Sequence, residues 1–108
     1  MGFVKIPHDL LDWQWYGDKN TVYAYLNLLL EASWGESVHR GVHLKRGQVV
    51  TTYPEIAKKC GISASQARTI IQRLKATGKI AVKITPKYSI ITMLEYSFGE
   101  NDVSQSNR

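Results

Sequence analysis

Residues 52–82 read TYPEIAKKCGISASQARTIIQRLKATGKIAV, and this stretch carries the signals that decide the fold. Thr52 and Glu55 have the Thr-x-x-Glu spacing of a capping box, in which each side chain bonds to the other residue's backbone N–H at the start of a helix. The spacing predicts a short helix that runs to about Cys60. Gly61 is placed to end it, because glycine readily adopts the left-handed backbone that closes a helix.

A longer helix is predicted only two residues later. Ser63 is its expected N-cap, and Gly78 supplies a stop after Thr77. Two helices joined by so short a turn predict a helix-turn-helix. Small or apolar residues stand at the positions that this motif buries: Ile56, Ala57, Cys60, Gly61, Ile62, Ala67, Ile70, Ile71 and Leu74.

Two runs of alternating side chains follow the longer helix. Isoleucine and valine alternate with other residues over 80–84, and a similar run covers residues 88–94 beyond Pro86 and Lys87. Alternation with a period of two is typical of strands that bury one face. These runs predict a β-hairpin, the wing of a winged helix.

The N-terminal half is predicted to be mainly helical. Residues 8–16 suit a short helix, and Asp18 or Asn20 can cap a second helix over residues 21–34. The second helix is expected to be the central core helix, because its apolar residues have helical spacing. These are Val22, Tyr25, Leu26, Leu29 and Leu30, with Tyr23 and Leu28 widening the stripe.

The segment before the helix-turn-helix completes the expected fold. Residues 35–41 are polar and predict a loop, and residues 42–51 predict one extended strand that joins the hairpin. The fold class is therefore α+β: a winged helix-turn-helix with an N-terminal helical extension and a small antiparallel sheet.

Length and charge limit the domain organisation and favour one class of partner. The chain has 108 residues, enough for one modest core, and we expect one domain over residues 3–98 and a polar tail over residues 99–108. Residues 1–51 carry five basic and five acidic side chains, whereas residues 52–98 carry eight basic and two acidic ones, a net charge of +6. This asymmetry favours a polyanionic partner, most simply nucleic acid. A basic surface that serves only solubility is the alternative.

The longer helix is the expected DNA-reading element. With residues placed 100° apart, Ala67, Ile70, Ile71 and Leu74 fall on one face, and the opposite face carries groups that hydrogen-bond to bases and phosphates. The residues predicted to contact DNA are Ser63, Ser65, Gln66, Arg68, Thr69, Gln72 and Arg73 on this helix, Lys58 and Lys59 on the helix before it, and Lys83 and Lys87 on the hairpin. The lysines are expected on phosphates, and Gln66, Arg68, Thr69 and Gln72 on base edges.

Most of the chain, about residues 3–96, resembles a known family. The similar stretches are GFVKIPHDLLDWQWYGDKNTVYAYLNLLLEASW, RGVHLKRGQVVTTYPEIAKKCGIS, ISASQARTIIQRLKATGKIAV and YSIITMLEY. They resemble the N-terminal domain of phage replisome organisers and DnaD-like primosome proteins. The resemblance implies DNA binding at an origin or primosome. It also implies replication proteins as partners, through a C-terminal domain that is not present here.

Two other functions stay open. One is a transcriptional regulator with the same fold, and the other is a winged helix that binds a protein and recruits replication machinery. The target sequence, a homodimeric state and a preference for single or double strands are also left open.

No catalytic site, cofactor or metal is expected. The chain shows neither a phosphate-binding glycine-rich loop nor a nucleophile beside a base. His39 and His43 have a spacing seen in zinc sites but lack a Cys-x-x-Cys pair. The single Cys60 falls at a core position of the helix-turn-helix and fits a reducing cytoplasm, and no apolar run reaches the ~20 residues of a membrane span. The aromatic residues are expected to pack in the core rather than to stack on single-stranded bases.

Overall fold

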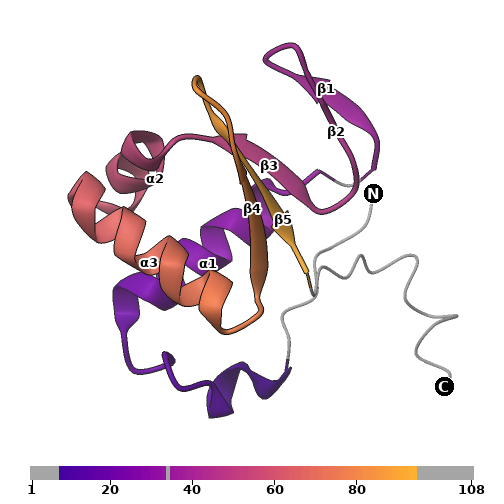
Figure 1. The fold of residues 1–108 in the computed structure, drawn as a ribbon. Helices are drawn as coiled ribbons and strands as arrows, with labels where there is room; N and C mark the ends of the chain where they lie inside the picture. Colours follow the sequence, from indigo (N-terminus) through magenta and orange to yellow (C-terminus); the bar gives the residue numbers. More distant parts are fainter. Residues whose placement is uncertain (1–7, 34, 95–108) are drawn as a thin grey trace, which may run out of the picture.

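The structure is a computed structural model that describes residues 8–33 and 35–94 (Figure 1). Its elements are η1 (a 3₁₀ helix, His8–Asp12), α1 (Lys19–Glu31), β1 (Ser37–His39), β2 (Val42–Leu44), β3 (Gln48–Thr51), α2 (Tyr53–Cys60), α3 (Ala64–Ala76), β4 (Ile80–Ile84) and β5 (Ser89–Met93). This order confirms the predicted α+β architecture, a winged-helix-like fold with a helix-turn-helix formed by α2 and α3.

The hairpin after α3 forms as predicted and joins a third strand. β5 lies in the centre of an antiparallel sheet with the order β3-β5-β4. Ile91 is paired with Val49 of β3 on one side and with Val82 of β4 on the other. The short strand before α2 and the wing are therefore one continuous sheet, which fixes the wing relative to the helices.

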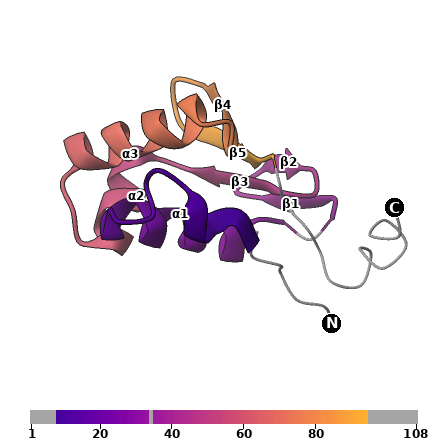
Figure 2. The ribbon, with the colours of Figure 1, turned by 90° about the horizontal axis from the view of Figure 1, so that it is seen from below.

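The core lies between the three α-helices and one face of this sheet. Its fully buried side chains include Tyr25 and Leu29 of α1, Ile71 and Leu74 of α3, and Ile91 of β5. Figure 2 shows α3 along one side of the domain and α1 along the opposite side, with the strands extending away from the helices. The outer faces of α1 and α3 therefore point in different directions.

The predicted single strand over residues 42–51 was wrong, as was the loop predicted over residues 35–41. β1 and β2 form a separate hairpin, and a turn with Gly47 at a φ of 84° divides β2 from β3. The hairpin turns at Arg40 and Gly41, whose φ values of 55° and 76° are both positive. Two consecutive residues with positive φ match the twist of paired strands, so the Arg-Gly turn favours a tight hairpin.

The predicted apolar stripe of α1 was wrong in its phase, and α1 ends at Glu31 rather than at residue 34. The buried residues are Thr21, Ala24, Tyr25, Leu28 and Leu29. Leu30 is 72% exposed and Tyr23 is 51% exposed. Because apolar residues surround most of this helix, periodicity alone left the core-facing side ambiguous.

The N-terminal extension is less helical than expected. The five residues of η1 are followed by turns up to Gly17, where a helix over residues 8–16 was predicted. Trp13 packs against Tyr25, with ring centroids 5.5 Å apart. Asp18 caps α1 as predicted. The predicted polar tail over residues 99–108 lies outside the described residues. Among those described, no helix has the length and apolarity needed to cross a membrane.

Candidate nucleic-acid interface

The helix α3 is held in the orientation that the sequence predicts. Ala67, Ile70, Ile71 and Leu74 are all buried, so the opposite face points to solvent. That face presents the predicted DNA-contacting residues Ser65, Arg68, Thr69 and Gln72, all of them exposed. These side chains offer hydroxyl, amide and guanidinium groups and no carboxylate. Such groups form hydrogen bonds with base edges and phosphates.

A complete capping box starts α3. The hydroxyl of Ser63 accepts the N–H of Gln66 at 3.1 Å, and the amide oxygen of Gln66 accepts the N–H of Ser63 at 2.9 Å. Two N–H groups at the helix end are thereby satisfied. Gln66 therefore has a capping role, which the sequence did not predict. Because a glutamine uses both its amide oxygen and its amide nitrogen to pair with adenine, base reading by Gln66 would require this box to open.

Arg73 is tied to the N-terminal part of the chain. Its guanidinium forms an ion pair with Asp18, donates to the hydroxyl of Thr21 at 3.3 Å, and lies 4.6 Å from the ring centre of Trp15. Partial burial raises the pKa of the Asp18 carboxyl, but the two hydrogen bonds from Thr21 and the charge of Arg73 outweigh it and hold this pKa below its usual value. Arg73 thus joins α3 to the start of α1. No local pattern predicts this contact, because 55 residues separate Arg73 from Asp18.

Arg68 lies beside an aromatic ring of α2. Its guanidinium carbon is 5.5 Å from the ring centre of Tyr53, a distance at which the ring quadrupole attracts a cation. Arg68 is exposed and Tyr53 is half-buried. The contact places the arginine at the edge of the polar face, between α2 and α3.

The two lysines of α2 have different surroundings. Lys58 and Lys59 are both exposed, but the ammonium of Lys59 forms an ion pair with Glu31 at the end of α1. At its first turn, α2 forms only half of the predicted capping box. The hydroxyl of Thr52 accepts the N–H of Glu55 at 3.2 Å, whereas the Glu55 carboxylate binds Arg40 at 2.8 Å and the hydroxyl of Thr51 at 3.2 Å. Glu55 thus anchors the β1–β2 hairpin to α2.

The wing presents two exposed lysines on a defined turn. Lys83 lies on β4, and Lys87 lies in the turn between β4 and β5. Thr85 closes this turn: its N–H and its hydroxyl both donate to the carbonyl of Tyr88, at 2.8 Å and 2.7 Å, and the hydroxyl accepts the N–H of Tyr88 at 3.0 Å. The position of Lys87 is therefore fixed by the backbone of the turn.

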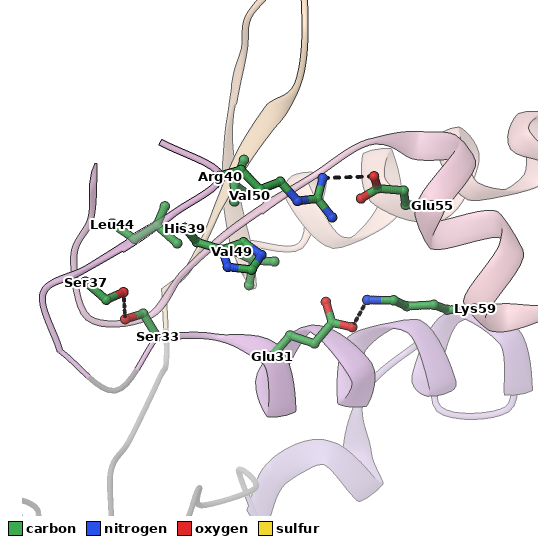
Figure 3. Close-up of a pocket in the computed structure, with 10 residues that line it drawn as sticks. All are labelled: Glu31, Ser33, Ser37, His39, Arg40, Leu44, Val49, Val50, Glu55 and Lys59. Carbon is green, nitrogen blue, oxygen red and sulfur yellow. Dashed lines mark hydrogen bonds and ion pairs between the residues drawn. The ribbon is translucent and has the colours of Figure 1, made fainter. Parts of the chain in front are cut away.

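A separate cavity of about 350 Å³ lies between the β1–β2 hairpin, the end of α1 and α2 (Figure 3). Leu44, Val49 and Val50 form its apolar part. The charged groups at its edge neutralise one another in the pairs Arg40–Glu55 and Lys59–Glu31. The pKa of the Glu55 carboxyl is lowered, and the hydrogen bond from Arg40 is the largest cause.

Two further candidates from the sequence lie near this cavity. His39 lines it, whereas His43 does not, and the described part of the chain holds no cluster of three or more metal-binding side chains. Cys60 is half-buried at the end of α2, and burial, aided by the charge of Glu31, raises the pKa of its thiol. A raised pKa keeps a thiol protonated and poorly nucleophilic.

Comparison with known proteins identifies a family but no annotated relative. A family model described as FaeA-like protein matches residues 19–85, which extend from the start of α1 to just beyond β4 and make up more than half of the chain. The comparisons with curated proteins and with solved structures gave no match.

Proposed function

We propose that this chain, which belongs to the FaeA-like protein family, binds duplex DNA through the outer face of α3, with Lys58 of α2 and the wing lysines on flanking phosphates. The observation that carries the proposal is the composition of this face. Ser65, Arg68, Thr69 and Gln72 are exposed on a capped and well-packed helix, and no acidic residue occurs from Ile56 to Leu94.

Rigid placement of these groups supports base reading over non-specific attraction. The buried residues of α3 fix its rotation, the capping box fixes its start, and Arg73 fixes its second half against the N-cap of α1. A side chain on a fixed helix enters the major groove in one register, which sequence discrimination requires. The proposed division is therefore phosphate contacts from Lys58, Lys83 and Lys87 and base contacts from α3.

A replication setting is proposed only from the sequence resemblance to phage replisome organisers and DnaD-like primosome proteins. The description of the matching family specifies no ligand and no process. Replication and transcription both use winged helices that read duplex DNA. The test of the proposed function is therefore a test of DNA binding itself.

The deciding experiment is a fluorescence anisotropy titration of a labelled random duplex at several salt concentrations, repeated with a single strand of the same length. We expect binding that weakens as salt rises, with a log–log slope of about −0.9 for each phosphate contacted, and a preference for the duplex. Lys45→Ala serves as the control, because Lys45 is exposed but lies outside the proposed surface. Absence of binding to any duplex at low salt by a folded protein would refute the proposal and favour a protein-binding winged helix.

A further inference from the structure

A polar groove runs along one side of the proposed recognition helix. It lies between the start of α1 and α3, and its volume is about 320 Å³. We call it the α1–α3 groove, defined by Asp18 and Asn20 on one side and by Ser65, Thr69 and Arg73 on the other. Ser65 and Thr69 also belong to the exposed face of α3. The groove is therefore continuous with the face that we propose reads duplex DNA.

The groove offers hydrogen-bond donors that the protein itself leaves unused. Asn20 and Ser65 are exposed, and neither side chain forms a hydrogen bond within the part of the chain that the structure describes. Lys19, the residue before Asn20, is also exposed and forms no ion pair with any described residue. A hydroxyl, an amide and an ammonium group gathered in this way are the groups with which proteins hold the phosphates of DNA.

The carboxylate that lines the groove does not oppose such a ligand. Asp18 is paired with Arg73 and accepts hydrogen bonds from the hydroxyl and the N–H of Thr21. The charges of Asp18 and Arg73 cancel, so the charge that remains beside the groove is the positive charge of Lys19.

The place of the groove on α3 indicates which part of a duplex occupies it. A helix with its side chains is about 10–12 Å across and the major groove is about 12 Å wide, so both strand backbones lie against the sides of a helix seated there. Arg68, beside Tyr53 of α2, marks one side of α3. Arg73, paired with Asp18 at the start of α1, marks the other. One backbone is therefore expected to pass α2, and the other is expected to pass the α1–α3 groove.

We propose that the α1–α3 groove binds a phosphate of the strand that passes the α1 side of α3, with hydrogen bonds from Asn20 and Ser65 and a charge contact from Lys19. The proposal rests on the proposed function, because the duplex must be seated on α3. It assigns a phosphate contact to α1, where that function places none.

The first test adds a charge to the groove without weakening the helix. Asn20→Asp puts an acidic residue in the first turn of α1, which the helix dipole favours, so the melting temperature should not fall. The added carboxylate repels a phosphate, so the dissociation constant for random duplex in anisotropy titrations should rise on the order of 10-fold. Asn27→Asp is the matched control, because it makes the same change about two turns along α1 and outside the groove. It should leave the dissociation constant nearly unchanged.

The second test locates the contact on the DNA. In a selected duplex site, one phosphate at a time is replaced by an uncharged methylphosphonate, and the dissociation constant is measured for wild type, Lys19→Gln and Lys58→Ala. Lys19→Gln should weaken binding to the unmodified site and reduce the salt slope by about one unit. This loss should disappear when the phosphate that Lys19 contacts is the one replaced. The loss caused by Lys58→Ala should disappear at a phosphate of the other strand.

The results distinguish this proposal from the proposed function. If the folded wild type binds no duplex, both are wrong. If Gln72→Ala weakens binding to the selected site but Asn20→Asp and Lys19→Gln bind like the wild type, the proposed function stands and the groove proposal is overturned. Equal losses for Asn20→Asp and Asn27→Asp would also overturn it, because they would reflect net charge rather than a contact. So would Lys19 and Lys58 contacts that map to the same strand.

Discussion

Arg73 of α3 forms an ion pair with Asp18, the N-cap residue of α1, and also lies over the ring of Trp15. One arginine thereby joins the proposed recognition helix to the start of the central helix. Arg73 was predicted to contact DNA, and that role remains a prediction. The ion pair gives Arg73 a second role, which is to position α3.

The Asp18–Arg73 pair should make stability depend on pH. The pKa of Asp18 is lowered in the folded protein, so its contribution is fully present above the pKa of about 3.9 in the unfolded chain and is lost as the pH falls through the folded value. Asn retains the cap but not the charge. Asp18→Asn should therefore lower the melting temperature at neutral pH, and the difference from wild type should shrink below about pH 4.

Asp18→Ala provides a comparison for the same pair, because it also removes the cap. The loss should be larger, about 1 kcal/mol for the cap alone. Equal melting temperatures for wild type, Asp18→Asn and Asp18→Ala at neutral pH would show that the ion pair and the cap contribute nothing to stability.

Ile71→Asp should unfold or severely destabilise the domain. Ile71 is 1% exposed between α3 and the rest of the core, and an unpaired carboxylate there costs several kcal/mol, roughly 3–5. The same change at the exposed Ile84 should cost about 1 kcal/mol or less. Thermal melting measures both variants, and similar losses at the two positions would contradict the assigned core.

The phosphate-binding lysines should not be equivalent. Lys58→Ala, Lys83→Ala and Lys87→Ala should each weaken binding to all duplexes similarly and reduce the salt slope by about one unit. Lys59→Ala should have a smaller effect, because Glu31 already neutralises this lysine. Anisotropy titrations at several salt concentrations measure the slopes. A Lys59 effect as large as that of Lys58 would show that DNA displaces Glu31.

The residues on the outer face of α3 should affect discrimination rather than folding. Thr69→Ala and Gln72→Ala should cost on the order of 1–3 kcal/mol on a selected site and much less on random duplex, with unchanged melting temperatures. Gln66→Ala differs from these two variants, because it opens the capping box and should also lower the melting temperature. The preferred site is first obtained by selection from a random duplex library. Unchanged preference in all three folded variants would refute base reading by α3.

Local signals in the sequence determined where α2, α3 and the wing begin and end. Thr52 and Ser63 cap their helices, and Gly61 and Gly78 follow them with φ values of 70° and 80°. A cap or a glycine stop acts within one helical turn, so it can be recognised from a few consecutive residues of the sequence. The buried face of α3 was equally predictable, because its other face is polar and the period is unambiguous. The same helical phase predicts which residues of α3 are exposed in the candidate site.

Only the tertiary structure decided how distant segments meet. The core-facing side of α1 is set by packing, because apolar residues surround the helix and allow several phases. The pairs Arg73–Asp18, Lys59–Glu31 and Arg40–Glu55 join segments that are 55, 28 and 15 residues apart. Each pair changes the role of a residue that the sequence presented as a free charge or a cap. Such contacts depend on where the folded chain brings two groups together, and that is fixed by burial of the common core rather than by either residue's neighbours in the sequence.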